Sequence, residues 1–445
     1  METFLIKALQ LILSLSILVI VHEFGHFLFA RLFKIRVEKF YLFFNPFFTL
    51  FKYKPKNSET EYGIGWLPLG GYVKIAGMID ESMDKEQMKL PAQPYEFRSK
   101  PAWQRLLVMV GGVLFNFILA IAIFSMVLFS SGDTYLPVKD ITMGAEFSDV
   151  PKEVGFRDGD IVVSADGEEL LYRDSRILDM NTLLKILNAK SVLVIRDGQE
   201  VNIDIPKDFM DRFVASGQGF WAFNRPTIVN SVAQGSAASI IGLKEDDRII
   251  SVNDTETPTY ISFRKKMEDC KGKETTFIII REGQRDTLTT QIDTTGTVGF
   301  FAKTPMEIYK TVHKDFSVFE SFPGGINLGM ETLTGYIAQF KLVFTKEGIT
   351  KMGGFGAIGN LFPAQWDWYT FWMMTAFLSI MLGVMNILPI PALDGGHVMF
   401  LLYEVITRRK PNEKFMEYAQ VVGMILLFGL IIFANGNDLY RAIFG

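Results

Sequence analysis

The stretch His22-Glu23-Phe24-Gly25-His26 has the form H-E-x-x-H and lies inside the apolar run Ala8–Phe33. On a helix the two histidines, four residues apart, face the same side and can bind one zinc ion, with Glu23 beside them as a general base. Ionisable residues within a membrane span are costly and indicate function. The alternative is a pair of histidines packed in a helix interior, which the membrane setting disfavours. The sequence therefore predicts one Zn²⁺ per chain.

The composition is that of a membrane protein with sizeable aqueous parts. Hydrophobic residues make up 49% of the chain, yet charged residues still reach 21%. The 445 residues are too many for one small domain and predict several units. The net charge of -4 gives no reason to expect nucleic acid as a partner. Cys270 is the single cysteine, so it predicts no internal disulfide and does not indicate the compartment.

Four segments are long enough to span a bilayer, which needs about 20 apolar residues. The predicted transmembrane helices are residues 1–33, 106–130, 369–394 and 418–436. Lys and Arg are concentrated in the segments 34–105 and 395–417, which the positive-inside rule places in the cytoplasm. Both termini and the region 131–368 are then exoplasmic, with the zinc motif nearer the cytoplasmic face. The first helix carries that motif where a cleavage site would lie, so we do not expect a signal peptide.

The exoplasmic region contains an internal repeat, in which Val154–Ser164 resembles Ile241–Ser251. Each copy continues through a turn into a β-rich stretch that ends near a hairpin signal. The pattern resembles two tandem PDZ domains, over 131–222 and 223–304, although Asp246 stands where a Gly is usual. Such domains would bind an extended peptide in a groove beside a sheet edge. The alternative is a pair of β-rich spacers that only exclude bulky proteins.

A second group of polar residues and prolines interrupts the third predicted span, in the stretch N-I-L-P-I-P-A-L-D-G-G-H at 386–397. Its prolines would break the helix and free backbone groups that protein or water must satisfy. Asp394 is a ready third zinc ligand, which leaves the fourth position of a catalytic site for water. The alternative is a turn at the membrane surface with Asp394 as a helix cap. The presence of the distant H-E-x-x-H motif favours the zinc ligand.

Together the two motifs resemble the site-2 protease family of intramembrane zinc metalloproteases. Further matches are Pro68–Lys74, the residues Gly112 to Phe117 in the second span, the tandem repeat, and the closing N-x-x-P-x-x-x-x-D-G. The order of these features is similar to the bacterial branch that cleaves the anti-sigma factor of the envelope stress response. One departure is Phe355, which stands where the family has the proline of G-G-P-I-G-I.

The resemblance implies roles for several residues. The implied functional residues are the zinc ligands His22, His26 and Asp394 and the catalytic base Glu23. His397 is then left outside the ligand set. Asn116, which is polar within the second span, is expected to form an interhelical hydrogen bond, and the alternative is that it orients a loop or the substrate. The resemblance also implies a multi-pass protein of the bacterial inner membrane, with the PDZ-like domains in the periplasm.

The family has a membrane-associated β element with a G-x-G sequence, which Gly63-Ile64-Gly65 would match within Tyr62–Val73. We expect a re-entrant β-hairpin here that dips towards the active site, although an ordinary cytoplasmic hairpin is the alternative. A β edge near the zinc would hold an unwound substrate by strand addition. Residues 305–368 are expected to form amphipathic connector helices, on the membrane surface or in solvent. The candidate substrate-positioning residues are Asn386, Pro389, Gly63, Gly65, Gly70 and Gly71.

These observations predict a multi-span α-helical membrane protein with four transmembrane helices, two β-rich PDZ-like exoplasmic domains and a membrane-associated β-hairpin. The expected activity is an intramembrane zinc endopeptidase that cuts single-span membrane proteins in regulated intramembrane proteolysis. Its substrate would be an anti-sigma factor after a first cut, or remnant signal peptides. Its other expected partners are the lipid bilayer and peptide ligands of the PDZ-like grooves.

Two rival functions come from other classes of protein. The first is a catalytically idle membrane scaffold that presents PDZ-like grooves, but a scaffold has no need of the base Glu23. The second is a membrane-anchored zincin that cuts soluble proteins. Both zinc motifs lie within predicted spans, which soluble substrates could not reach.

Overall fold

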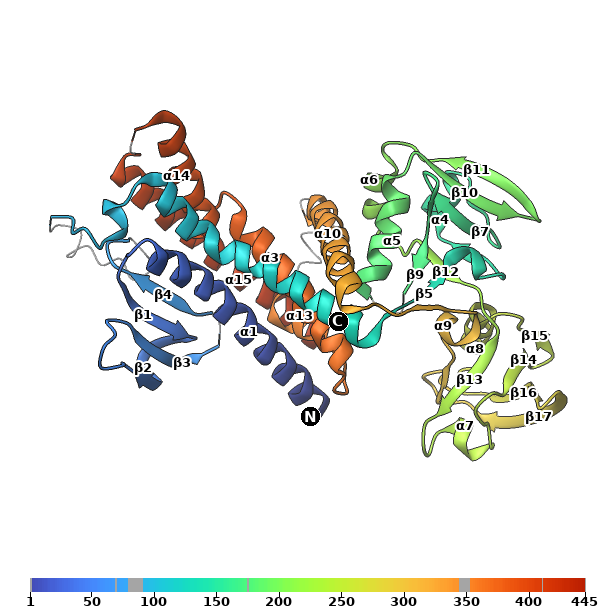
Figure 1. The fold of residues 1–445 in the computed structure, drawn as a ribbon. Helices are drawn as coiled ribbons and strands as arrows, with labels where there is room; N and C mark the ends of the chain where they lie inside the picture. The colour runs from blue at the N-terminus through green and yellow to red at the C-terminus, as the bar shows by residue number, and fades with distance from the viewer. Residues whose placement is uncertain are drawn as a thin grey trace. The chain divides into compact units, whose positions relative to one another are not determined.

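The chain folds into two units, one built on long apolar helices and one rich in β-strands (Figure 1). The computed structural model describes residues 2–68, 70–78, 91–173, 176–343, 353–409 and 411–444. Unit 1 contains the chain up to Gly132 and most of the chain from Asp315 onward, and unit 2 contains Asp133–Lys314. The predicted membrane part and the predicted exoplasmic part are therefore separate compact bodies.

Among the residues described, four helices of unit 1 are long and apolar enough to cross a membrane, which confirms the predicted number of spans. They are α1 (Glu2–Leu32), α3 (Ala102–Ser131), α13 (Trp368–Ile387) and α15 (Glu413–Phe444). Helix α3 packs against both α1 and α13. A Cβ on Gly25 of α1 would lie 2.3 Å from the carbonyl oxygen of Gly111 in α3. The two glycines therefore let α1 and α3 cross at backbone distance.

The helix of the third span ends before Asp394, and this corrects two predicted boundaries. Helix α13 ends before Pro389 and Pro391, and α14 (Asp394–Thr407) follows them. Proline lacks a backbone N–H and its ring clashes with the preceding turn, so a continuous helix cannot form through both residues. The predicted third helix over 369–394 is therefore too long. The predicted loop over 395–417 is also wrong, because it contains most of α14 and the start of α15.

A four-stranded sheet precedes α3 in unit 1, with the strand order β2-β3-β1-β4. Its strands are β1 (Val37–Leu42), β2 (Phe44–Tyr53), β3 (Glu61–Leu67) and β4 (Tyr72–Ile75). Strand β1 pairs in parallel with β3 and antiparallel with β4, so it lies between them. The expected hairpin over Tyr62–Val73 is therefore wrong, and the hairpin of this sheet is formed by β2 and β3. Within the described residues β4 pairs with β1 alone and forms one edge.

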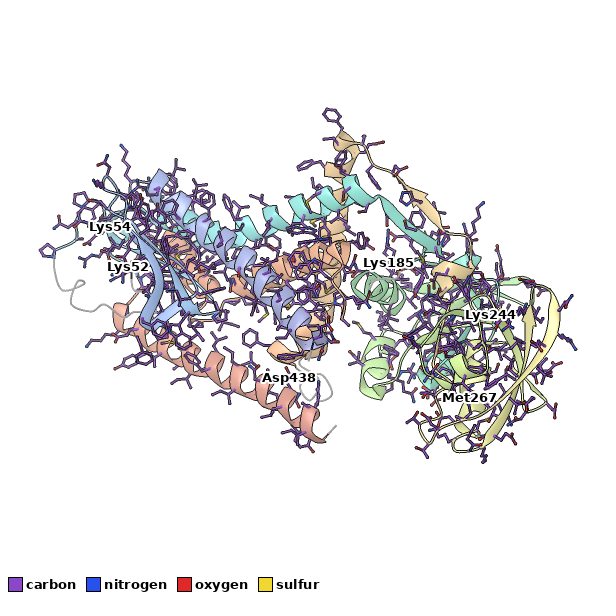
Figure 2. The ribbon with its side chains drawn as sticks, turned by 90° about the horizontal axis from the view of Figure 1, so that it is seen from below. Lys52, Lys54, Lys185, Lys244, Met267 and Asp438 are labelled. Atoms are coloured by element: carbon purple, nitrogen blue, oxygen red, sulfur yellow. The ribbon has the colours of Figure 1, made fainter. Side chains whose placement is uncertain are left out.

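The other edge strand, β2, exposes much apolar surface. The side chain of Phe47 is 100% exposed, and Phe48 and Phe51 are also exposed. Lys52 lies on the same strand and Lys54 follows its last residue, and both are labelled in Figure 2. Contiguous exposed apolar surface marks a site of membrane or protein contact. The combination of phenylalanine and lysine suits the boundary between lipid tails and anionic headgroups.

Helix α10 (Val318–Val343) packs against α3 and α13 of unit 1. A Cβ on its Gly325 would lie 2.2 Å from the Oγ of Ser125 in α3, so the two helices are in close contact. This part of the expected connector over 305–368 is therefore a packed helix rather than a solvated one. The short helix α12 (Phe355–Gly359) follows, and most residues between α10 and α12 lie outside those described.

Unit 2 contains two copies of one strand–helix pattern, which confirms that this region is β-rich. The first copy consists of β6 (Ala145–Phe147), α4 (Asp149–Glu153), β7 (Ile161–Ala165), β8 (Glu168–Glu169), α5 (Arg176–Asn188), β10 (Ser191–Arg196), β11 (Gln199–Asp204), α6 (Phe209–Ser216) and β12 (Trp221–Phe223). The second consists of β13 (Thr227–Val232), α7 (Ala237–Ile240), β14 (Arg248–Val252), β15 (Thr255–Glu256), α8 (Tyr260–Glu268), β16 (Glu274–Arg281), β17 (Gln284–Gln291) and β18 (Phe300–Ala302).

A small sheet ties together the two ends of unit 2. It contains β5 (Asp133–Pro137), β9 (Leu171–Tyr172) and β19 (Val312–Lys314). Strand β5 pairs antiparallel with β19, and Asp133 lies opposite Lys314. The chain therefore enters and leaves unit 2 at neighbouring points. The Nδ1 of His313 in β19 lies 2.7 Å from Thr134 Oγ1 in β5, so this histidine has a structural partner.

The two copies share one ion pair in detail. Arg196 and Arg281 each donate hydrogen bonds to both carboxylate oxygens of an aspartate, Asp160 in the first copy and Asp247 in the second. Each arginine also binds the main-chain carbonyl five residues before its aspartate. Asp246, which stands where the first copy has glycine, has a φ of 68°. Aspartate tolerates this left-handed conformation, so the turn is retained without glycine.

Candidate metal centre

Three potential zinc ligands meet although they are far apart in the sequence. His22 and His26 lie one turn apart on α1, and Asp394 is the first residue of α14. The Nε2 atoms of the histidines are 3.2 Å apart, and Asp394 Oδ2 lies 3.2 Å from His22 Nε2 and 3.3 Å from His26 Nε2. Ligand atoms of a tetrahedral zinc ion, bound at about 2.0–2.1 Å, lie about 3.3 Å from one another. The triangle therefore has the dimensions of one face of a zinc tetrahedron.

The hydrogen bonding around this triangle also favours a cation. His26 Nδ1 lies 2.9 Å from the carbonyl oxygen of Val108, which can only accept, so Nδ1 holds the ring proton and Nε2 keeps a lone pair. Asp394 Oδ2, which faces this lone pair, is buried and has no hydrogen-bond partner. Acceptors that face each other without a donor are unfavourable, and a cation between them satisfies both. These residues therefore fit zinc.

Helix α3 shapes the space around the two imidazoles. A Cβ on Gly112 would lie 2.4 Å from His26 Nε2 and 2.6 Å from His22 Cε1, so any side chain at this position would displace the rings. One turn further along α3, the Nδ2 of the buried Asn116 lies 3.0 Å from His22 Nδ1. The expected interhelical hydrogen bond of Asn116 is thus made to a ligand candidate. Sequence reasoning missed this partner, although the spacing Gly112-x-x-x-Asn116 within a span was a usable signal.

The ligand triangle lines a cavity of about 720 Å³ in unit 1. Glu23, half-buried on α1, lines the same cavity. Strand β4 forms part of the wall, and the backbone of Val73 lies against the Glu23 carboxylate. The predicted base, the predicted ligands and one edge of the sheet therefore share a single space.

The predicted substrate-positioning residues divide into two groups. Those that line the cavity are Asn386, Gly70 and Gly71. Those that do not are Gly63, Gly65 and Pro389. Asn386 lies nearest the chemistry, with its Nδ2 3.4 Å from His22 Nε2. Gly63 instead lies inside the sheet, where a Cβ would be 2.3 Å from the ring of Tyr41, and Pro389 lies in the break between α13 and α14. The G-x-G of β3 therefore serves close packing within the sheet.

The short helix α12 reaches the cavity through Phe355 and Ile358. The Phe355 N–H donates to Asn435 Oδ1 of α15 at 3.2 Å, and Asp438 Oδ2 of α15 accepts from two further N–H groups of the same segment. A proline at position 355 would have no N–H for the first of these bonds. The departure from the G-G-P-I-G-I pattern therefore adds a contact between α12 and the last span.

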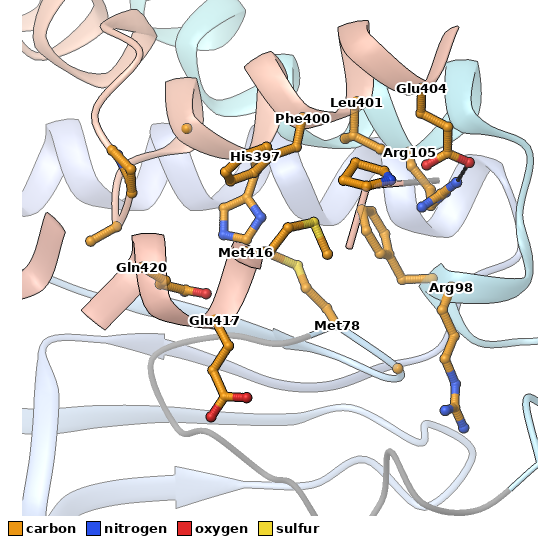
Figure 3. Close-up of a pocket in the computed structure, with 16 residues that line it drawn as sticks. Met78, Arg98, Arg105, His397, Phe400, Leu401, Glu404, Met416, Glu417 and Gln420 are labelled. Atoms are coloured by element: carbon orange, nitrogen blue, oxygen red, sulfur yellow. Dashed lines mark hydrogen bonds and ion pairs between the residues drawn. The ribbon is translucent and has the colours of Figure 1, made fainter. Parts of the chain in front are cut away.

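A second, smaller pocket of about 140 Å³ adjoins the zinc cavity (Figure 3). The walls of both spaces include Met78, His397 and Gln420. The smaller pocket carries charged groups, among them the ion pair of Arg105 Nη2 and Glu404 Oε1 at 2.5 Å. His397 therefore lies at the boundary between the two spaces. It does not belong to the ligand triangle.

Comparison with known proteins agrees with this geometry. The model of peptidase family M50 matches residues 10–430. The chain is 29% identical to Protease RseP of Yersinia pestis and 28% identical to Regulator of sigma E protease of Salmonella typhimurium strain LT2, over 97% of this chain and of each relative. It is 26% identical to a Vibrio cholerae protein that bears a zinc metalloprotease name, again over 97% of both chains.

The family match establishes the cofactor and the class of reaction. The relatives are bacterial zinc metalloproteases, so zinc is the cofactor and the reaction is peptide-bond hydrolysis. The four apolar helices and the relatives make this chain a bacterial multi-pass membrane protein that acts on membrane-protein substrates within the bilayer. Because the matching region covers most of its length, the chain belongs to peptidase family M50, the site-2 proteases.

Proposed function

We propose that this protein cuts the transmembrane segments of single-span membrane proteins, as a step of regulated intramembrane proteolysis. The observation that carries the proposal is the triangle of His22, His26 and Asp394, which shares a cavity with Glu23 among helices long enough to span a membrane. The proposed substrate is an anti-sigma factor, cut after a first protease has acted, and the relative named Regulator of sigma E protease links the family to a sigma factor. Remnant signal peptides are a second substrate class of the same form.

The proposed mechanism assigns one task to each residue near the triangle. The two histidines and Asp394 would hold the zinc ion, which would supply Lewis-acid chemistry by polarising the scissile carbonyl and lowering the pKa of the attacking water to about 7. Glu23 takes a proton from the attacking water and delivers it to the leaving amine. Asn386 Nδ2, 3.4 Å from His22 Nε2, is placed to donate a hydrogen bond to the scissile oxygen as negative charge develops on it.

Strand β4 is the proposed holder of the substrate backbone. A substrate helix must unwind before it is cut, because its carbonyls are otherwise held in i→i−4 hydrogen bonds. The unwound segment then needs partners for its N–H and C=O groups within the membrane. Tyr72–Ile75 lines the cavity beside Glu23 and, within the described residues, pairs only with β1. Strand addition at this edge would bind substrates through their main chains and tolerate varied side chains.

The proposed orientation places the zinc site near the cytoplasmic face of the inner membrane and unit 2 in the periplasm. The Lys and Arg residues of segments 34–105 and 395–417 support this orientation through the positive-inside rule. The exposed phenylalanines of β2, with Lys52 and Lys54, support contact of that strand with the anionic cytoplasmic leaflet. The two copies in unit 2 are proposed to act on substrates as PDZ-like domains, by binding peptides or by excluding bulky proteins.

The proposal is tested by incubating the purified full-length protein with a panel of single-span peptides and mapping the cuts by mass spectrometry. We expect cuts within the apolar segment, which a zinc chelator abolishes and added zinc restores. The matched control is Glu23→Gln, which keeps the size of the side chain but cannot accept the proton. It should bind zinc and leave the peptides intact.

Two outcomes would contradict the proposal. Full cleavage by the Glu23→Gln protein would remove Glu23 from the mechanism. Cleavage of soluble proteins without cleavage of any membrane-spanning peptide would assign the same zinc centre to a different substrate class.

A further inference from the structure

Asn116 is a polar side chain buried in the helix bundle of unit 1, and it contacts a proposed zinc ligand. Its exposed fraction is 0%, and its Nδ2 lies 3.0 Å from His22 Nδ1. The other end of the amide, Oδ1, is buried without a hydrogen-bond partner. A buried amide oxygen without a partner is unfavourable, so this arrangement calls for an explanation beyond helix packing.

The backbone position of Asn116 is fixed by its surroundings. Ser379 of α13 donates from its Oγ to the main-chain oxygen of Asn116 at 2.7 Å, and both residues are fully buried. One turn earlier on α3, Gly112 leaves the space that the ring of His22 occupies. Helix α3 therefore contacts the imidazole of His22 at two positions, with the space left by Gly112 and with the side-chain amide of Asn116.

The identity of the amide atom that faces His22 decides whether the ring can bind a metal. His22 binds zinc through Nε2 only in the tautomer that carries the ring proton on Nδ1. That proton needs an acceptor, which the amide oxygen provides and the amide NH₂ does not. Half a turn about the Cβ–Cγ bond of Asn116 exchanges the two ends of the amide. It brings the unpartnered Oδ1 to His22 Nδ1.

We propose that Asn116 is a positioning residue of the zinc centre. Its amide oxygen accepts the Nδ1–H of His22 and holds the tautomer and ring orientation that present Nε2 to zinc. The inference rests on the proposed zinc ligation by His22. For His26 the main-chain oxygen of Val108 fills the same role at 2.9 Å. The acceptor of His22 is thus a side chain that a substitution can remove, whereas the acceptor of His26 is main chain.

The test compares three variants of the full-length protein in one detergent. Asn116→Leu removes the acceptor with a side chain of similar size, and Asn116→Asp restores an acceptor oxygen. The matched control is Thr375→Val. Thr375 is fully buried on α13, donates to Ser14 Oγ at 3.0 Å and does not line the zinc cavity. It therefore reports the general effect of losing a buried interhelical hydrogen bond. The readouts are zinc affinity, by competition with a chromophoric chelator, and the absorption bands of the cobalt-substituted protein.

We expect Asn116→Leu to weaken zinc binding about 10–100-fold, the usual effect of losing an outer partner of a ligand histidine. It should also shift the cobalt bands, because the ring of His22 is no longer held. Asn116→Asp should retain the affinity and the spectrum of the parent, and so should Thr375→Val. Unchanged affinity and bands in Asn116→Leu would overturn the inference. Equal losses in Asn116→Leu and Thr375→Val, or in both Asn116 variants, would also overturn it.

His22→Ala separates this inference from the proposed ligand set. If His22→Ala binds zinc as tightly as the parent, the assignment of His22 as a ligand fails. If His22→Ala loses zinc while Asn116→Leu keeps it, the ligand assignment stands and the role of Asn116 fails.

Discussion

At the scale of single residues, the zinc centre depends on positions occupied by glycine. Gly25 and Gly111 bring the backbones of α1 and α3 into contact, and Gly112 leaves the volume that the two imidazoles fill. Protein interiors are packed so densely that one added methyl group is felt. The histidines of α1 therefore meet Asp394 because α3 carries glycine opposite them.

Replacement of Gly112 by alanine should abolish tight zinc binding. The new Cβ would lie 2.4 Å from His26 Nε2, so the ring must move out of the triangle. The control is Gly429→Ala in α15, where a Cβ meets no atom within 4 Å and the helix should gain up to about 1 kcal/mol. Zinc content of the purified proteins, measured by atomic absorption, checks the expectation. A full complement of zinc in Gly112→Ala would show that the rings can relax.

The Asp247–Arg281 pair gives unit 2 a pH dependence. Burial acts to raise the pKa of the Asp247 carboxyl, but the hydrogen bonds from Arg281 and from the Lys244 N–H outweigh it and lower the pKa below its usual value. A carboxyl with a depressed folded pKa stabilises the fold above its unfolded pKa of about 3.9. That contribution disappears as the pH falls through the folded pKa.

Arg281→Met should therefore destabilise unit 2 at neutral pH, by about 3 kcal/mol for a pair with one fully buried partner. The difference from the parent should begin to shrink as the pH falls below the unfolded pKa of about 3.9, and it should disappear below the depressed folded pKa, where the carboxyl of the folded parent is protonated as well. Thermal unfolding of residues 133–314, measured at neutral pH and at acid pH, tests this change. A difference that is the same at neutral and acid pH would exclude the ion pair as its cause.

At the scale of elements, the edge strand β4 and the break before α14 position the chemistry. The edge exists because β1 pairs with both β3 and β4, which leaves the far side of β4 towards the cavity. Ile64 of β3 is not at an edge, since it pairs with Leu42 on one side and Phe51 on the other. A proline at Ile64 would disrupt the sheet, so Val73 is the informative position for a test of substrate binding.

Val73→Pro should slow turnover without releasing zinc. Proline removes the backbone N–H at this position, which lies against the Glu23 carboxylate, and the loss of one hydrogen bond to that carboxylate or to a bound strand should lower kcat/KM roughly tenfold. The control is Val73→Ala, which keeps the N–H and shortens the side chain. Substrates with Gly or Pro near the cut site should be less affected, because they unwind more easily. Equal effects of the proline and alanine variants would contradict strand addition at β4.

At the scale of the whole molecule, all the described residues that line the zinc cavity belong to unit 1. The paired strands β5 and β19 place Asp133 opposite Lys314, and antiparallel partners have Cα atoms about 4.5–5.5 Å apart. Unit 2 can therefore be removed between Gly132 and Asp315 and the gap closed by a short Gly/Ser linker. These end points leave no unpaired strand behind.

Deletion of residues 133–314 should leave one zinc ion bound per chain. If unit 2 excludes bulky substrates, the deletion should permit cutting of substrates that carry large exoplasmic domains. If it recruits substrates, the deletion should slow the cutting of short ones. Rates measured on matched short and long substrates distinguish the two roles. Unchanged rates on both substrate classes would exclude each of them.

Features that depend on neighbouring residues could be predicted from the sequence alone. Four apolar runs predicted the four helices, because membrane insertion depends on the composition of each segment. The spacing of His22 and His26 placed both on one helical face, since a helix repeats every 3.6 residues. The repeat at Val154 and Ile241 predicted two copies of one local structure. The ion pairs of Asp160 and Asp247 now show this similarity in atomic contacts.

How separate segments meet could not be predicted from the sequence and is seen in the folded protein. The order of β1, β3 and β4 and the start of α14 at Asp394 are among these results. So are the clearance at Gly112 and the contact of Asn116 with His22, which join α1 to α3. Each of them depends on how one element packs against another that is distant along the chain. Periodicity describes one element at a time, so it gives the face that a side chain occupies but not the atom that it touches.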